Sequence, residues 1–502
     1  MMRLCLCMLI LGHGIACWAE SYSLVINNGR VLDPETGLDA IRHVGIRDGS
    51  VVLVAQEPLQ GDSVIDAGGL VVAPGFIDLH THSPTELGQY YQLFDGITTA
   101  LELEAGTFPV MAYAERISDQ ALINYGASAG YLTLRLLEKD GISAPDPSGV
   151  PSPVGLKGWM TALRFLFTDL NSALERSFTE VATPQELVKL RALLEQGLHD
   201  GGLGIGLPLD YMSEAVDSAE LRMVFDVAAQ RGAPIFVHIR RGINGDPSGL
   251  REVLDLAQET GAPLHVCHIS HNAMKNIELF LAEVRDAQAR GVDVTTEVLP
   301  YNAGSTSISA AVFSRDWQTI FDISYADVEW AATGERFTEA TWYEYREKHP
   351  TGAVIHHYLK EDWTLRAIRE PGVMIVSDLL PMTSRDEHVP PHNGAFTKVL
   401  GKYVRQEQAL DLMSAIAKMT LLPAQRLQVY APVFARKGRI QAGMDADITV
   451  FDPATVNANA SYRDPYQEAT GIEYVIVNGQ PVVRQGQLVE GVFPGRRLTA
   501  NQ

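Results

Sequence analysis

The chain has 502 residues, of which 46% are hydrophobic and 20% charged, and its formal net charge is −21. A chain of this length can bury a large core and form two domains. The acidic balance argues against nucleic-acid binding, because a phosphate backbone needs a basic surface. The composition is that of a globular protein, without a tract typical of disorder.

The first residues, "MMRLCLCMLILGHGIACWAES", differ from the rest of the chain. A basic start at Arg3 leads into an apolar run and then into small residues. This pattern predicts a secretory signal over 1–19, cleaved after Ala19, and an exported protein, periplasmic or secreted. A retained membrane anchor is less favoured because the run is short. Lipoprotein anchoring through Cys17 is a further alternative. Cleavage would leave only Cys267, so no internal disulfide is expected.

Short β segments are predicted at both ends of the mature chain, over 20–74 and 433–502. The first stretch includes "YSLVINNGRVLD" and "HVGIRDGSVVLVA", and the last includes "ADITVFDP" and "IEYVIVNGQPVV". Alternating apolar residues with Asn-Gly and Asp-Gly turns are typical of hairpins. We therefore expect one small β-sandwich domain built from both termini.

The middle of the chain, 75–432, alternates strand-like and helix-like segments. Helices are expected near 85–94, 218–231, 248–260 and 274–290. Repeated strand–helix units of this length favour a parallel (β/α)8 barrel. A doubly wound open sheet is the alternative, but no glycine-rich phosphate loop follows the first strand. Residues 305–370 fit the repeat poorly and are expected to form an insertion over the barrel mouth.

Polar residues close several of the predicted buried strands. In "PGFIDLHTHSP", His80 and His82 share one strand face, although such a pair alone is weak support for a metal site. His238, His268 and Asp378 end three further apolar runs. The carboxyl ends of barrel strands form the active-site face, so these side chains should converge. Burying them together is costly without a cation, and the pattern therefore predicts a metal site.

The second predicted barrel strand contains "LELEAG", in which Glu102 and Glu104 share one face. Branched apolar residues normally fill a barrel interior, so carboxylates there need a reason. A ligand that bridges two metal ions is one such reason, and a salt bridge is the alternative. We favour Glu104 as the ligand, with Glu102 second. His265 is expected to face the surrounding helices, and Cys267 to be a core residue.

These motifs, together with "GITT", "HVCHIS", "LPYNAGST" and "GRIQAGMDADITVFDP", resemble the amidohydrolase superfamily. The most similar branch is that of the N-acyl-D-amino-acid deacylases, or D-aminoacylases, and the likeness spans nearly the whole mature chain. The resemblance implies a (β/α)8 barrel with a small β domain. It also implies that Asp378 shuttles protons, and that the metal ligands are His80, His82, His238, His268 and Asp378.

Two departures from the branch affect the site. The branch usually has a cysteine at the end of strand two, where this chain reads "LELEAG", and "GLGIGLPLDYM" lacks the lysine that other superfamily members carboxylate. A glutamate bridge would fill this vacancy. "EHVPPHNGAF" also lacks the arginine that the branch shows after a His-Pro. Arg240 and Tyr301 are the predicted substrate-carboxylate ligands, with a rim salt bridge and core packing as their alternatives.

The predicted function is that of a metal-dependent amidohydrolase cleaving a linear amide, an N-acyl-D-amino acid by preference. Metal-activated water attacks the carbonyl, while Asp378 serves as general base and then general acid. One or two divalent ions are expected, zinc by preference, with manganese, iron and cobalt as alternatives. A cyclic-amide hydrolase of the dihydroorotase or hydantoinase type is a second hypothesis. A non-catalytic exported ligand-binding protein of the same fold is a third.

Overall fold

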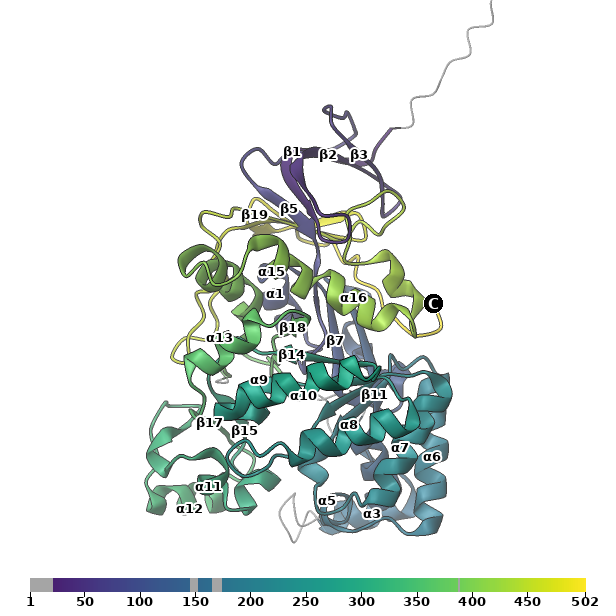
Figure 1. The fold of residues 1–502 in the computed structure, drawn as a ribbon, viewed down its shortest axis with the longest axis vertical. Helices are drawn as coiled ribbons and strands as arrows, with labels where there is room; N and C mark the ends of the chain where they lie inside the picture. Colours follow the sequence, from purple (N-terminus) through teal and green to yellow (C-terminus); the bar gives the residue numbers. More distant parts are fainter. Residues whose placement is uncertain (1–20, 145–151, 165–173, 387–388) are drawn as a thin grey trace, which may run out of the picture.

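The computed structural model describes residues 21–144, 152–164, 174–386 and 389–502. The predicted signal over 1–19 lies outside these ranges. Most strands belong to two sheets, and Figure 1 shows strands from both ends of the chain above a body of strands and helices from its middle. None of the described helices is long and apolar enough to cross a membrane.

The central sheet has eight strands, all paired in parallel. Its first and last strands meet through the segments that follow them: Asp378 N–H donates to His80 O at 2.8 Å, and His82 N–H donates to Leu379 O at 2.8 Å. The predicted (β/α)8 barrel is therefore confirmed. In chain order the strands are β6 (Phe76–Asp78), β7 (Ile97–Thr107), β8 (Asn124–Gly130), β11 (Ile205–Pro208), β12 (Ile235–His238), β13 (Leu264–Val266), β14 (Val294–Val298) and β18 (Val373–Ile375).

Amphipathic helices connect these strands and cover the barrel. In α7, Asp217 caps the first turn by accepting from Glu220 N–H, and Gly232 ends the helix with a φ of 65°. Such caps satisfy backbone groups that the helix leaves unpaired at its ends. The main helices are α1 (Glu86–Phe94), α6 (Pro184–His199), α7 (Ser218–Arg231), α8 (Ser248–Thr260), α10 (Ile277–Ala289), α13 (Glu361–Arg369), α15 (Leu412–Met419) and α16 (Leu421–Gln428).

The second sheet has nine strands and joins the two ends of the chain. Val71 and Val72 of β5 pair antiparallel with Phe451 and Val450 of β19, so an N-terminal and a C-terminal strand are direct neighbours. The predicted β domain from both termini is thus confirmed. Its strands are β1 (Leu24–Asp33), β2 (Leu38–Arg47), β3 (Ser50–Ala55), β4 (Val64–Asp66), β5 (Val71–Pro74), β19 (Ile448–Phe451), β20 (Ile472–Val477), β21 (Gln480–Arg484) and β22 (Gln487–Leu488).

An insertion after β14 forms a small antiparallel sheet of its own, β15 (Gly304–Ser307), β17 (Ala353–His356) and β16 (Val328–Trp330). Its aromatic core includes Trp317 and Trp342, whose rings lie 5.0 Å apart. Independent packing of this kind explains why the segment does not follow the strand–helix repeat. The insertion contributes one wall of the pocket described below, as expected for the segment over the barrel mouth.

Candidate active site

The polar residues singled out in the sequence come together at the carboxyl ends of the barrel strands. His80 and His82 follow β6, Glu104 belongs to β7, and His238 is the last residue of β12. His268 and Asp378 come shortly after β13 and β18. Five chain segments distant in sequence therefore present nitrogen and carboxylate oxygen atoms to one location, as the barrel topology requires. These six residues are called the ligand cluster.

One half of the ligand cluster contains His80, His82 and Asp378. The Nε2 atoms of the two histidines are 3.2 Å apart, and Asp378 Oδ1 lies 3.5 Å from the first and 3.4 Å from the second. Glu104 Oε2 lies 3.5 Å from each of the same Nε2 atoms. Four potential ligand atoms thus surround one point.

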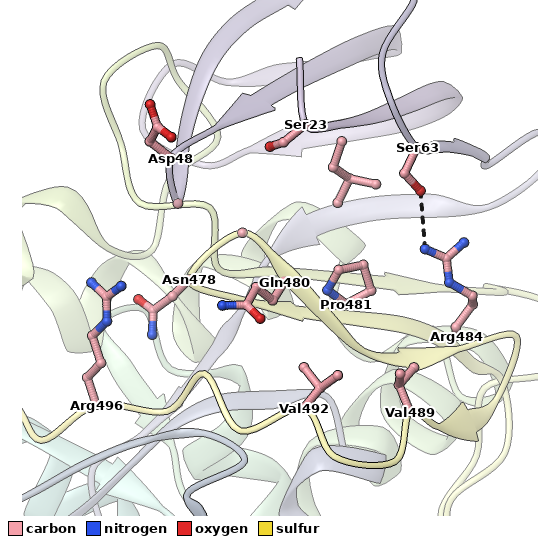
Figure 2. Close-up of a pocket in the computed structure, with 13 residues that line it drawn as sticks. Ser23, Asp48, Ser63, Asn478, Gln480, Pro481, Arg484, Val489, Val492 and Arg496 are labelled. Carbon is pink, nitrogen blue, oxygen red and sulfur yellow. Dashed lines mark hydrogen bonds between the residues drawn. The ribbon is translucent and has the colours of Figure 1, made fainter. Parts of the chain in front are cut away.

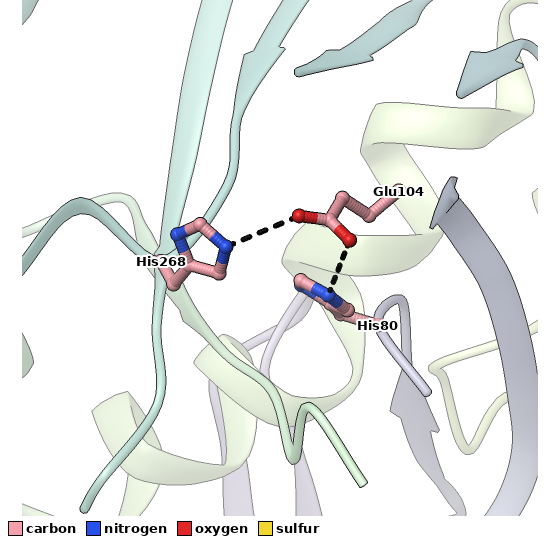
Figure 3. Close-up of side chains that lie close together, drawn as sticks. All are labelled: His80, Glu104 and His268. Atoms are coloured by element: carbon pink, nitrogen blue, oxygen red, sulfur yellow. Dashed lines mark hydrogen bonds and ion pairs between the residues drawn. The ribbon is translucent and has the colours of Figure 1, made fainter. Parts of the chain in front are cut away.

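The other half contains His238 and His268. Glu104 Oε1 lies 2.8 Å from His238 Nδ1 and 3.2 Å from His268 Nε2. Figure 3 shows the Glu104 carboxylate between His268 and His80, with one oxygen directed to each. The two oxygens therefore serve different halves of the cluster, which is the arrangement that a bridging carboxylate requires.

The protonation pattern shows that a cation fits this cluster. His80 Nδ1 lies 2.6 Å from Glu297 Oε1, and His82 Nδ1 lies 2.8 Å from Glu102 Oε2. Because a carboxylate accepts hydrogen bonds, each Nδ1 donates a proton to its carboxylate, and each Nε2 is the atom that would bind a metal ion in place of a proton. The Nε2 atoms then face one another and the oxygens of Glu104. Ligand atoms this close together can all bind one metal ion. Carboxylate–histidine pairs of this kind orient metal ligands.

Charge within the cluster favours the same conclusion. Burial alone would lower the pKa of His80, but the carboxylates of Asp378, Glu297 and Glu104 raise it well above its usual value. Burial likewise opposes protonation of His82, yet Glu102 and Asp378 raise its pKa to about 10. The surrounding histidines hold the pKa of Glu104 well below its usual value despite burial. The negative field that binds protons to these histidines also attracts a divalent cation.

Glu102 does not occupy the position predicted as the second choice of ligand. Its Oε2 contacts His82 Nδ1, and its Oε1 accepts from the backbone N–H groups of Ala105 and Gly106 at 3.2 and 3.4 Å. The carboxylate is thereby directed to the far side of the His82 ring. Glu102 is placed to orient a ligand, whereas Glu104 reaches both halves of the cluster.

Glu297 in β14 is a site residue that the sequence reasoning missed. Its Oε1 contacts His80 Nδ1, and its Oε2 lies 2.9 Å from His265 Nε2. His265 Nδ1 in turn lies 2.7 Å from Thr295 Oγ1. The prediction that His265 faces the surrounding helices is therefore wrong. The signal was present in "DVTTEVLPY", where one glutamate interrupts an apolar strand as Glu104 does in β7.

Two residues of the cluster have left-handed backbone conformations, with φ of 32° at His268 and 49° at Asp378. For residues other than glycine, such conformations cost of order 1–3 kcal/mol each and are concentrated at functional sites. Here they turn the chain sharply after β13 and β18. The turns direct both side chains toward the cluster instead of along the strand.

A pocket of about 380 Å³ opens over the ligand cluster. The barrel contributes Glu104, His238 and Asp378 to its lining, and the insertion contributes Ser305 and His356, among others. The Asp378 side chain is 22% exposed while Glu297 is 1% exposed. Asp378 therefore meets whatever enters the pocket, whereas Glu297 acts only through its neighbours.

Neither of the predicted substrate ligands lines this pocket. Arg240 Nη1 lies 3.3 Å from both carboxylate oxygens of Glu252, so the rim salt bridge named as its alternative is what the structure contains. The Tyr301 ring is buried and stacks on His392 with centroids 5.0 Å apart, and Lys398 Nζ lies 3.8 Å from its centre. The structure therefore contains the core packing that was named as the alternative to substrate binding for Tyr301.

A larger hollow, about 670 Å³, lies beside the strands of the terminal sheet. Figure 2 shows Ser63 across from Arg484, with a hydrogen bond of 3.4 Å between them. Among the described residues that line it, Asp48 is the sole carboxylate and there is no histidine or cysteine. Size alone therefore does not mark the reactive site; the convergence of ligand atoms does.

A parallel barrel with nitrogen and carboxylate ligands at its carboxyl face defines the class of metal-dependent barrel hydrolases. A model of the amidohydrolase family matches residues 63–282 and 212–483. An N-acyl-D-glutamate deacylase from Alcaligenes xylosoxydans xylosoxydans is 30% identical over 93% of this chain and 94% of its own length. A D-aminoacylase from the same organism is 28% identical over 96% and 98%.

Among solved structures, the N-acyl-D-glutamate deacylase of Bordetella bronchiseptica, in complex with zinc and a phosphonate inhibitor, has a TM-score of 0.76. The two chains are 25% identical, and the match covers 96% of this chain and 100% of the solved one. The chain belongs to the amidohydrolase family and is a metal-dependent hydrolase of carbon–nitrogen amide bonds. The two relatives named above belong to the N-acyl-D-amino-acid deacylase branch, which confirms the predicted resemblance.

Proposed function

We propose that the protein hydrolyses the amide bond of an N-acyl-D-amino acid, with zinc as its preferred metal. The observation that carries this proposal is the position of Glu104, which gives one oxygen to each half of the ligand cluster beneath the pocket. The D-amino-acid substrates named for its relatives support the choice of substrate.

The residues of the ligand cluster would hold one or two divalent ions. Imidazole nitrogens and carboxylate oxygens are the donors that suit zinc. When bound, such an ion lowers the pKa of water and polarises a carbonyl group. The protein's own part is to orient the ligands, through Glu102 on His82 and Glu297 on His80, and to shape a pocket above them.

Asp378 is the proton carrier in this proposal. Its side chain is more exposed than those of Glu104 in the ligand cluster and of Glu297 beside it. Its neighbours lower its pKa despite burial, so it is ionised at neutral pH. The oxygen of water bonds to the acyl carbon as Asp378 takes the proton. The carbon–nitrogen bond then breaks as Asp378 delivers the proton to the leaving nitrogen.

Zinc-loaded protein should release acetate from N-acetyl-D-amino acids faster than from their L-enantiomers. Release should depend on the metal, because a bound ion would lower the pKa of water and polarise the acyl carbonyl. Acetate would be measured across a panel of both enantiomers, and the ring opening of dihydroorotate and hydantoin would be followed by chromatography. Opening of the cyclic amides alone would favour the dihydroorotase-type alternative. Metal-loaded protein inert toward the whole panel would favour a ligand-binding role.

We further propose that the protein is exported, periplasmic or secreted, and that Cys17 does not anchor it. The basic, apolar and small-residue order of 1–19 supports this proposal, and those residues lie outside the described ranges. N-terminal sequencing of protein produced with the intact leader should begin at Glu20. An N-terminus at Met1 or a lipidated Cys17 would contradict it.

A further inference from the structure

Arg241 is a charged residue next to the ligand cluster that neither the sequence reasoning nor the proposed mechanism uses. It follows β12 by three residues and lines the pocket. One of its guanidinium nitrogens, Nη2, lies 3.5 Å from Nε2 of His238, whose Nδ1 faces Glu104. A positive charge therefore lies immediately beside the group of atoms that would hold the metal.

The surroundings fix the guanidinium but leave its hydrogen-bonding capacity unused. Its carbon lies 5.0 Å from the ring centre of Phe321 and 5.8 Å from that of Tyr358, both from the insertion. Nη2 has two long contacts, 3.4 Å to Asn272 Oδ1 and 3.5 Å to His238 Nε2. Nε is buried and has no hydrogen-bond partner among the described residues. Rings that hold a cation in place without using its N–H groups leave those groups available to a ligand.

The neighbouring arginines differ in this respect. Arg240 is paired with Glu252, and Arg315 Nη2 lies 3.0 Å from both oxygens of Asp210. Within the part of the chain that the structure describes, no such carboxylate pairs with Arg241. Of the three, Arg241 alone presents an uncommitted guanidinium to the pocket, and a planar guanidinium is suited to bind a carboxylate through two N–H groups.

The position of this charge matches the chemistry of an N-acyl amino acid. In such a substrate the α-carboxylate is attached to the carbon next to the amide nitrogen, so it must lie close to the scissile bond. An anchor for it has to be adjacent to the metal ligands, as Arg241 is to His238.

The described lining of the pocket has no second arginine or lysine that could bind a carboxylate on the substrate's side chain. Among its described lining residues Arg241 is the sole arginine or lysine, and Asp210, Glu104 and Asp378 are acidic. Apart from these residues and the histidines, the described lining is uncharged, and it includes the apolar Leu132 and Val312. An acidic substrate side chain would be desolvated near carboxylates without a cation to pair with.

We propose that Arg241 binds the α-carboxylate of the substrate and that the pocket selects amino acids with an uncharged side chain. This inference rests on the proposed deacylase function and adds the substrate class to it. It also separates this protein from relatives named for acidic substrates, the N-acyl-D-glutamate and N-acyl-D-aspartate deacylases.

Arg241→Gln should lower kcat/KM for N-acetyl-D-leucine by about 10- to 100-fold, the range expected for losing hydrogen bonds to a charged group. Acetate release from N-acetyl-D-leucinamide, which has no carboxylate, should change little. Arg241→Lys should recover part of the loss for the acid. Arg240→Gln is the matched control outside the pocket, and it should behave as wild type. Equal losses for acid and amide, with metal content retained, would overturn the assignment of Arg241.

The side-chain preference is tested with two substrates of nearly equal size. Wild-type protein should hydrolyse N-acetyl-D-glutamine at least about 10-fold more efficiently than N-acetyl-D-glutamate, the factor by which an unpaired charge is disfavoured at a cost of roughly 1.4 kcal/mol. Equal or reversed efficiency would overturn the uncharged class. If wild-type protein hydrolyses neither these substrates nor N-acetyl-D-leucine, the proposed function itself fails, an outcome distinct from failure of the Arg241 assignment.

Discussion

Glu104→Gln is expected to lose most of its bound metal and to reduce turnover by more than about 100-fold. Altering a residue that only supports a metal ligand costs about 10–100-fold, and Glu104 contacts ligand histidines in both halves of the cluster. An amide has one oxygen and no negative charge, so it cannot join the two halves. Metal content would be measured by elemental analysis of the purified protein, and turnover by acetate release.

Glu102→Gln is the matched control, because it removes the same charge two residues away. Glu102 contacts His82 Nδ1 and the backbone, so its replacement should weaken the orientation of one ligand and retain more metal. Circular dichroism would confirm that both variants fold. A greater loss of metal in Glu102→Gln than in Glu104→Gln would contradict the assignment of Glu104 as the bridge.

Asp378→Asn is expected to lower turnover by about 10²–10⁴-fold, the contribution typical of positioned acid–base catalysis. Asparagine retains an oxygen near His80 and His82 but cannot accept the proton from water. It also tolerates the left-handed backbone at this position, where φ is 49°. Much of the metal should therefore remain bound while hydrolysis stops.

Asp48→Asn provides the control for this change. Asp48 also has a left-handed backbone, with φ of 51°, and it lines the hollow beside the terminal sheet and not the pocket over the cluster. This variant should hydrolyse N-acetyl-D-amino acids as the wild type does. Turnover of Asp378→Asn equal to that of the control would remove Asp378 from the proton transfer.

The sequence predicted elements best where burial imposes a regular period. Helices expected over 218–231 and 248–260 appear as α7 and α8 with those bounds, because each presents an apolar face to the barrel and ends at a glycine in the left-handed region. The histidines of the ligand cluster are predictable for a related reason. Polar residues at the ends of buried strands are rare unless a ligand compensates for their burial.

The misassignments of Glu102 and Arg240 lie where the strand period stops. The pairing of β7 with β8 shifts between Glu102 and Thr107, so two glutamates of equal strand parity have different neighbours. Arg240 and Arg241 follow the last residue of β12, and nothing in their spacing indicates which one turns into the pocket. The aromatic rings that hold Arg241 come from the insertion, far away in sequence. Such contacts are set by tertiary packing.

The central claim is that hydrolysis depends on a metal ion held by the ligand cluster. It is tested most directly by removing metal from the full chain with a chelator, dialysing, and titrating zinc back while acetate release from N-acetyl-D-leucine is followed. The account predicts that metal-free protein is inactive and that turnover returns in proportion to bound zinc until the first site is filled. Full turnover by protein shown to be metal-free would contradict it.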